Sequence, residues 1–457
     1  MAFAKDFVWG AAAASYQVEG GAFEDGKGLS TWDVMCRKPG AIRDGNTGEV
    51  ACDHYHRYKE DVSLMKQIGL KAYRLSISWP RVLPEGIGTT NSKGMAFYDK
   101  LIDELVANNI EPYVTLFHWD FPYELYCRGG WLNPNSSDWF AEYVGVVVER
   151  LSDRVKNWIT FNEPQCFLGL GHFEGIDAPG LKLPVSELLL AGHNMFLAHG
   201  KAVQAIRAKS KQKCRVGYAP VGIVKIPVTE TQADIEAAKK VMFSVEQKNY
   251  DNNTWWMDPV YFGRYPEDGL QLFGTDMPKF AAKDLETISQ PLDFFGVNIY
   301  HGQATQMNDQ GKPEKVSMPL GHGLTMMNWA VTPDSLYWGS KFFYERYKKP
   351  IFITENGMAN TDWVALDGKV HDPQRIDFLH RYLLSLRRAE DEGIDVGGYF
   401  LWSIMDNFEW SSGFSKRFGI IYVDYATQQR IFKDSAYWYR DVIASNGELL
   451  DDKACIT

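Results

Sequence analysis

The sequence lacks the features that mark membrane, secreted and nucleic-acid-binding proteins. It has no apolar run of about 18 residues that would span a bilayer, and residues 1–6 lack the basic start and apolar core of a signal peptide. Acidic residues (58) outnumber basic ones (48), and the basic ones are scattered rather than clustered. We therefore expect a cytoplasmic protein whose partner is neither a membrane nor a nucleic acid.

Features that would divide or cross-link the chain are also missing. No linker rich in Pro, Ser or Gly interrupts it, so we predict a single domain over residues 1–457. The six cysteines show no Cys-x-x-Cys spacing, which argues against a zinc site and against a disulfide framework. We expect free thiols at Cys36, Cys52, Cys127, Cys166, Cys214 and Cys455.

The sequence does contain a regular alternation of strand-like and helix-like segments. Amphipathic helical patterns cover residues 56–68, 94–107 and 374–390, and Gly69 is placed to end the first of them. Eight rounds of strand and helix predict an α/β fold, a closed parallel (β/α)8 TIM barrel, rather than an open sheet. The predicted strands cover residues 7–17, 72–79, 112–120, 155–163, 215–222, 293–300, 351–356 and 397–406.

The chain is longer than the roughly 250 residues that such a barrel needs. We place the surplus in residues 18–53, 223–291 and 301–333. Loops that follow barrel strands lie at the carboxyl-terminal face, where the sites of barrel enzymes are found. We therefore expect long loops to wall a deep pocket.

Two of the predicted strands end in a carboxylate next to an amide. Residues 351–357 read Ile-Phe-Ile-Thr-Glu-Asn-Gly and present Glu355, whereas residues 158–164 read Trp-Ile-Thr-Phe-Asn-Glu-Pro and present Glu163. Either acid alone is more simply interpreted as a solvated strand end. Together they supply the proton donor and the nucleophile or base that cleavage of a glycosidic bond needs. Because Asn162 and Glu163 are neighbours on a strand, we expect a bulge or sharp bend if both face the site.

Polar and aromatic side chains also gather at the ends of the other predicted strands. Such groups bind sugar hydroxyls and stack on the apolar faces of sugar rings. A lone histidine or arginine is more often structural, but seven coincident strand ends favour a binding site. The candidates are Gln17, Arg74, His118, Trp119, Asp120, Asn298, Tyr300, Trp402, Asp406, Glu409 and Trp410.

A metal site is the competing interpretation, because His54 and His56 form a His-x-His motif of the kind seen in metal-dependent barrel hydrolases. These histidines begin a predicted helix instead of ending a strand, which favours a structural role. We expect neither a metal nor a cofactor.

Taken together, these motifs resemble glycoside hydrolase family 1, most of all its bacterial β-glucosidases. The resemblance covers nearly the full chain, and the combination of motifs is specific although each one is modest evidence. The motifs are Phe7-Val8-Trp9-Gly10, Tyr16-Gln17-Val18-Glu19-Gly20, Thr160-Phe161-Asn162-Glu163-Pro164, Ile353-Thr354-Glu355-Asn356-Gly357 and Asn407-Phe408-Glu409-Trp410. The resemblance implies a retaining enzyme that removes terminal β-D-glucosyl residues from cello-oligosaccharides or from aryl and alkyl β-glucosides. Side activity on β-galactosides and β-fucosides is also expected.

The resemblance implies roles for single residues as well. Glu163 would be the general acid/base and Glu355 the nucleophile, which Arg74, Asn298 and Tyr300 would orient and stabilise. A cis peptide is implied between Trp402 and Ser403. The implied sugar-binding residues are Gln17, His118, Trp119, Asn162, Trp402, Glu409 and Trp410. On the leaving-group side we add Trp329 as a candidate platform, with Cys166 and His172 as candidate wall residues.

The two carboxyl groups should share one proton. A retaining mechanism places them about 5–5.5 Å apart, so the charge of Glu355 disfavours ionisation of Glu163. Glu163 then keeps its proton to higher pH, while Arg74 keeps Glu355 ionised. Once Glu355 is esterified to the sugar, Glu163 becomes the stronger acid and can activate water.

Two alternatives to this function stay open. A catalytically inactive carbohydrate-binding relative would be expected to lack one carboxylate, and both are present. A 6-phospho-β-glucosidase on the same barrel would, by resemblance, carry Ser at position 409, Tyr at 418 and Lys at 416. This chain carries Glu409, Phe418 and Lys416, so one of the three positions agrees.

We expect the protein to cleave 4-nitrophenyl β-D-glucoside in preference to its 6-phosphate, because the carboxylate of Glu409 would repel a phosphate. Initial rates with the two substrates at equal concentration measure the preference. Cleavage of the 6-phosphate alone would assign the chain to the phosphoglycosidases instead.

Overall fold

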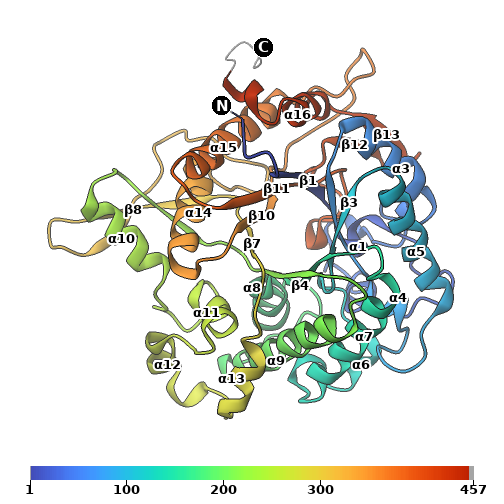
Figure 1. Cartoon of the computed structure of the whole chain (residues 1–457), viewed down its shortest axis with the longest axis horizontal. Helices are drawn as coiled ribbons and strands as arrows, with labels where there is room; N and C mark the ends of the chain where they lie inside the picture. Colours follow the sequence, from blue (N-terminus) through green and yellow to red (C-terminus); the bar gives the residue numbers. More distant parts are fainter. Residues whose placement is uncertain (1, 452–457) are drawn as a thin grey trace.

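The computed structural model describes residues 2–451, and in these residues eight parallel strands form a ring with helices around its outside (Figure 1). The ring strands are β1 Val8–Ala12, β2 Ala72–Ser76, β3 Glu111–Thr115, β4 Asn157–Asn162, β5 Arg215–Ala219, β7 Phe295–Asn298, β10 Ile351–Asn356 and β11 Val396–Trp402. The predicted (β/α)8 barrel is therefore confirmed.

Strand pairing follows the order β5-β4-β3-β2-β1-β11-β10-β7. Backbone hydrogen bonds between the segments at the two ends of this order complete the ring. The Asp293 amide donates to the Val216 carbonyl at 2.8 Å, and the Asn298 amide donates to the Pro220 carbonyl at 3.0 Å. Closure brings the carboxyl ends of all eight strands to one face.

Along the chain, most helices come between one ring strand and the next. In space they pack against the outside of the ring (Figure 1). They are α1 Ser15–Val18, α2 Thr31–Met35, α3 His54–Ile68, α4 Trp79–Val82, α5 Ser92–Ala107, α6 Tyr123–Cys127, α7 Ser136–Leu151, α8 Pro164–Leu168, α9 Val185–Lys209, α10 Gln232–Met242, α11 Thr254–Phe262, α12 Glu267–Phe273, α13 Ala282–Ile288, α14 Asp334–Tyr347, α15 Pro373–Asp391 and α16 Asp434–Ala444. None of the helices within residues 2–451 is long and apolar enough to cross a membrane.

The three predicted amphipathic helices are confirmed as α3, α5 and α15, and Gly69 ends α3 in the left-handed conformation at φ 79°. The first predicted strand is wrong beyond Ala12, because residues 15–18 form α1. There the Ser15 amide donates to the Ser76 hydroxyl at 2.7 Å, and the Gln17 amide donates to the Ala14 carbonyl. These bonds replace the strand ladder, and a sequence pattern does not report them.

The long segments contain further structure. Strands β6 Val224–Pro227, β8 Gly302–Met307 and β9 Pro313–Lys315 form a second sheet, and β12 Ile421–Asp424 pairs with β13 Gln429–Phe432. The second sheet lies at the side of the ring near α10 (Figure 1). The predicted free thiols are confirmed for Cys36, Cys52, Cys127, Cys166 and Cys214, and Cys455 lies outside the described residues.

Small residues face large ones in the barrel interior. A side chain at Gly10 would come within 2.5 Å of the Phe400 ring, and one at Gly217 within 2.2 Å of the Phe294 ring. The interior cluster also contains Trp402, which belongs to the candidate site. The barrel is thus a filled core whose upper layer supports the pocket.

A buried ion cluster ties the chain after β11 to the segment before α16. Lys433 Nζ lies 2.5 Å from Asp362 Oδ2 and 2.7 Å from Asp406 Oδ1. Arg375 pairs with the same Asp362 at 2.7 Å, and Arg417 pairs with Asp406 at 2.6 Å. The central charges of the cluster are excluded from water. The cluster therefore stabilises the fold only if its positive and negative charges compensate one another.

We expect Lys433→Met to destabilise the protein by about 3–5 kcal/mol, since it removes one of the two cations that contact each of the buried carboxylates of Asp362 and Asp406 and leaves their negative charge uncompensated. For a chain of this length the thermal midpoint should fall by about 3–5 °C. The control is Lys209→Met at the exposed Lys209–Glu149 pair, with an expected shift below about 1 °C. Equal shifts in scans at one heating rate would contradict the role of the cluster.

Candidate active site

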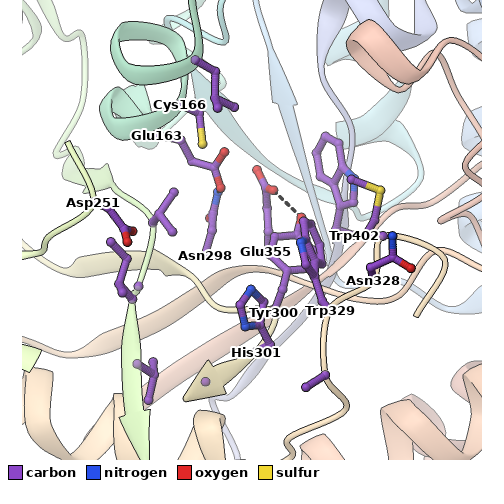
Figure 2. A pocket seen from close by; sticks show the side chains of 18 of the residues that line it. Glu163, Cys166, Asp251, Asn298, Tyr300, His301, Asn328, Trp329, Glu355 and Trp402 are labelled. Carbon is purple, nitrogen blue, oxygen red and sulfur yellow. Dashed lines mark hydrogen bonds between the residues drawn. The ribbon is translucent and has the colours of Figure 1, made fainter. Parts of the chain in front are cut away.

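A cavity of 680 Å³ lies at the carboxyl ends of the ring strands. Glu163, Asn298 and Glu355 point into the same space from three different strand ends (Figure 2). Both glutamates are nearly buried, with exposed fractions of 7% for Glu163 and 3% for Glu355. The two candidate carboxylates therefore share one cavity.

The backbone turns at the end of β4 to bring two neighbouring side chains into the site. The register of β4 against β5 shifts between Ile159 and Asn162, and Glu163 adopts the left-handed region at φ 46° and ψ 68°. This is the bend expected for Asn162 and Glu163. A non-glycine residue held in this region is strained, and such residues cluster at functional sites.

Glu355 is held from both of its oxygens. Arg74 Nη1 donates to Glu355 Oε1 at 2.5 Å, and the Tyr300 hydroxyl donates to Oε2 at 2.6 Å (Figure 2). Behind it, Gly357 packs so closely that a Cβ would lie 1.8 Å from the Trp402 carbonyl oxygen. Charge-assisted bonds from two sides leave the Glu355 carboxylate one orientation.

Asn298 contacts the other glutamate. Its Nδ2 donates to Glu163 Oε1 at 2.9 Å and to Asn162 Oδ1 at 3.0 Å. The same Asn162 oxygen accepts from Arg74 Nη2 at 2.6 Å, so one amide links the surroundings of both glutamates. Asn298 was expected to support Glu355. The structure places it near Glu355 and also in direct contact with Glu163.

The two glutamates differ in the groups that stabilise their negative charge. Burial, and then the charge of Glu355, raises the pKa of Glu163 to about 8 against weaker opposition from Asn298 and Cys166. Burial also raises the pKa of Glu355, but the Arg74 guanidinium and the Tyr300 hydroxyl pull it down. The surroundings of Glu355 thus stabilise its ionised form more than those of Glu163 do.

Four of the predicted sugar-binding rings form one group. Trp119 and Trp410 stack with centroids 4.6 Å apart, and His118 stacks on Trp402 at 5.7 Å and on Trp410 at 5.9 Å. The backbone is in the left-handed region at Trp119 (φ 80°) and Trp410 (φ 48°). Burial and the Arg74 charge hold the pKa of His118 well below 6.5, so its ring is neutral. The predicted cis peptide between Trp402 and Ser403 is confirmed.

Gln17, on α1, contacts Glu409, which lines the cavity. Its Nε2 donates to the Phe408 carbonyl at 2.9 Å and to Glu409 Oε2 at 3.3 Å. Its Oε1 is buried and has no hydrogen-bond partner among the described residues. Burial, followed by the charge of Glu355, raises the pKa of Glu409 to about 8. Gln17 and Glu409 thus offer an unused acceptor and a titratable carboxyl beside the cavity.

The candidate residues on the leaving-group side separate into two groups. Trp329 and Cys166 line the cavity, and Trp329 packs against Tyr300 with centroids 5.1 Å apart. His172 is buried outside this cavity, where its Nδ1 lies 2.8 Å from the Phe167 carbonyl oxygen. The expectation that His172 lines the wall is wrong, because Gly169–Glu174 forms a π-helix that turns it inward.

The His-x-His motif has other partners than a metal. His54 Nδ1 lies 2.7 Å from Asp61 Oδ2, and His56 contacts Asp53 and Glu24. In residues 2–451 no group of three His, Cys, Asp or Glu side chains is arranged to hold a metal ion.

Two threonines support residues of the site but were not among the candidates predicted from the sequence. Thr354 Oγ1 donates to Asn298 Oδ1 at 2.6 Å, which turns the amide nitrogen of Asn298 toward Glu163. Thr115 Oγ1 accepts from Arg74 Nε at 3.2 Å. Thr354 was detectable as a polar residue in an otherwise apolar strand, whereas Thr115 has no such signal.

Comparisons with known proteins agree with this geometry. The model of the family described as Glycosyl hydrolase family 1 matches residues 1–448. The chain is 44% identical to a 1,4-beta-D-glucan glucohydrolase of Thermotoga neapolitana, over 97% of this chain and 99% of that protein. It is 43% identical to Beta-glucosidase A of Thermotoga maritima, over 97% and 98%. The solved structure of a Thermotoga maritima beta-glucosidase in complex with glucoimidazole superposes with a TM-score of 0.89 at 42% identity, covering 98% of this chain and 99% of that one.

We expect Tyr300→Phe to move the acidic limb of the pH profile of kcat/KM to higher pH. The Tyr300 hydroxyl lowers the pKa of Glu355, so its loss raises that pKa, and Glu355 becomes ionised only at higher pH. The rate should also fall by about tenfold or more, as for a lost hydrogen bond to a charged group.

The matched control is Tyr337→Phe, which removes a 2.6 Å bond to the carboxylate of Glu392 away from the cavity. Its pH profile should be that of the unaltered protein. An unmoved acidic limb in Tyr300→Phe would remove Tyr300 from the support of Glu355.

Proposed function

The chain belongs to glycosyl hydrolase family 1, and from this premise we propose that it is a retaining β-glucosidase in which Glu163 is the general acid/base and Glu355 the nucleophile. The observation that carries the proposal is the unequal support of the two glutamates. Glu355 has a guanidinium and a phenol on its oxygens, whereas Glu163 has an amide and, within residues 2–451, no cation in direct contact. One is suited to remain ionised and the other to hold a proton.

In the first step the Glu355 carboxylate attacks the anomeric carbon of the β-glucoside. The bond from that carbon to the leaving oxygen breaks as Glu163 donates its proton to this oxygen. The products are the glucosyl ester of Glu355, the free leaving group and ionised Glu163. Arg74 and Tyr300 hold the attacking carboxylate in place, which reduces the entropy cost of the attack.

In the second step water attacks the same carbon from the side that the leaving group has left. Glu355 is now a neutral ester, so the charge that raised the pKa of Glu163 is gone and Glu163 is a carboxylate able to take a proton from water. The carbon–oxygen bond to Glu355 breaks and frees its carboxylate. Two inversions give glucose in the β configuration.

The glycone contacts are proposed from the ring cluster and from Gln17 and Glu409. Trp402 would stack on the apolar face of the glucosyl ring, and His118, Asn162, Trp119 and Trp410 would bind its hydroxyls. The unpartnered Gln17 Oε1 can accept from a hydroxyl in either orientation at C4, which supports side activity on β-galactosides and β-fucosides. Trp329 is the proposed platform for the leaving group.

Cello-oligosaccharides are the proposed natural substrates, and a role in cellulose degradation follows from them. A relative named 1,4-beta-D-glucan glucohydrolase supports this choice. The cytoplasm as the place of action stays a prediction from the sequence.

The structure supports a 6-phospho-β-glucosidase less well than a β-glucosidase. Lys416, the position that agrees with it, has its ammonium group against the Met326 carbonyl oxygen, and Glu409 lines the cavity. A sugar phosphate would meet the Glu409 carboxyl there.

Proton NMR of the first sugar released from 4-nitrophenyl β-D-glucoside tests the mechanism. The spectrum must be recorded before mutarotation mixes the anomers. We expect β-glucose first, because two displacements restore the starting configuration. If α-glucose appears first, water attacks directly and Glu355 is not the nucleophile. Glu355→Gln is the control: it should abolish turnover while glucoside binding, followed by intrinsic tryptophan fluorescence, persists.

A further inference from the structure

Another carboxylate of the same cavity, Asp177, has no part in the two steps above. It lies in the segment between the π-helix Gly169–Glu174 and α9. The Asp177 amide donates to the Leu170 carbonyl at 3.2 Å, and its carbonyl accepts from the Gly180 amide at 2.7 Å. The backbone therefore holds the side chain at a defined place in the wall.

The Asp177 carboxyl lacks the partners that a buried acid usually has. Only 5% of the residue is exposed, and its Oδ1 is buried without a hydrogen-bond partner among the described residues. Burial raises the pKa of Asp177 to about 6, and the nearby Ser411 hydroxyl is the group that opposes this shift. At neutral pH the group is thus a largely ionised carboxylate with spare acceptor capacity, which is costly unless a donor reaches it.

The surroundings place Asp177 toward the mouth of the cavity. Its neighbour Ile176 also lines the cavity and is 53% exposed, so this segment forms part of the rim. The charge of Asp177 acts on Cys166, which follows Glu163 by three residues in α8, and also on Glu409 across the cavity wall. Glu163 is the group proposed to protonate the leaving oxygen, so the wall on its outer side faces the leaving group.

From this geometry we propose that Asp177 is a specificity-determining residue that accepts a hydrogen bond from a hydroxyl of the leaving-group sugar. The inference rests on the proposed β-glucosidase function and names the class of leaving group that it favours. A glucosyl leaving group offers several hydroxyl donors, whereas a nitrophenol has no hydroxyl besides its reacting oxygen. Asp177 would therefore favour cello-oligosaccharides over aryl glucosides.

The test compares Asp177→Asn and Asp177→Ala with the unaltered protein on cellobiose and on 4-nitrophenyl β-D-glucoside. We expect kcat/KM for cellobiose to fall about tenfold in Asp177→Ala and less in Asp177→Asn, which keeps one acceptor oxygen. Values for the nitrophenyl glucoside should stay within about twofold. The control is Glu174→Gln, an exposed carboxylate shortly before Asp177 that is not among the residues lining the cavity, with both substrates unchanged within about twofold.

A second readout separates a leaving-group contact from a contact to the glucosyl ring that reacts. With 2,4-dinitrophenyl β-D-glucoside the first step is fast, so kcat reports the second step, from which the leaving group is absent. This kcat should be the same in the variants and the unaltered protein. A fall in it would overturn the proposal in favour of a glycone contact.

Two other results would also overturn the proposal. An equal loss on cellobiose and the nitrophenyl glucoside in both variants would mean that Asp177 only supports the loop, and an unchanged kcat/KM for cellobiose would mean that it does not touch substrate. Failure of the proposed function is separate, because the unaltered protein would then not cleave the nitrophenyl glucoside at all.

Discussion

Two carboxyl groups buried in one cavity cannot both be ionised without a large free-energy cost, and the site depends on how that cost is distributed. Arg74 and Tyr300 lower it for Glu355 by placing positive charge and a donor hydroxyl on its oxygens. Glu163 receives weaker support from the Asn298 amide and the Cys166 thiol, together with the repulsion of its neighbour. In the proposed mechanism this difference leaves the proton on Glu163 and the negative charge on Glu355.

This arrangement needs groups from four strands within hydrogen-bond distance of one another. Arg74 comes from β2, Asn162 from β4, Asn298 from β7 and Glu355 from β10. In an open sheet the ends of these strands would be spread along one edge. A closed ring places them around one axis, close to one another. The filled interior below them, with Phe400 against Gly10, keeps the ring from collapsing or shifting.

The cavity has a base and a mouth of different construction. Its base consists of strand ends and short turns that are buried and tied by hydrogen bonds on several sides. Its mouth is formed by the long connections, which contribute Asp177, Trp329 and the sheet of β6, β8 and β9. The proposed chemistry, which tolerates little displacement, thus belongs to the base. The proposed choice of leaving group belongs to segments that can vary without disturbing the barrel.

The sequence by itself determined the alternation of strands and helices, the left-handed end of α3 at Gly69 and the two strand ends that carry Glu163 and Glu355. These features are local, because apolar periodicity, glycine and proline act within a few residues. Only the tertiary structure decided which groups meet. Arg74 reaches Glu355 across 281 positions of the chain, residues 15–18 leave the strand because Ser76 binds the Ser15 amide, and His172 turns inward in a π-helix. Such contacts depend on closure of the ring and on packing between distant segments, which no local pattern records.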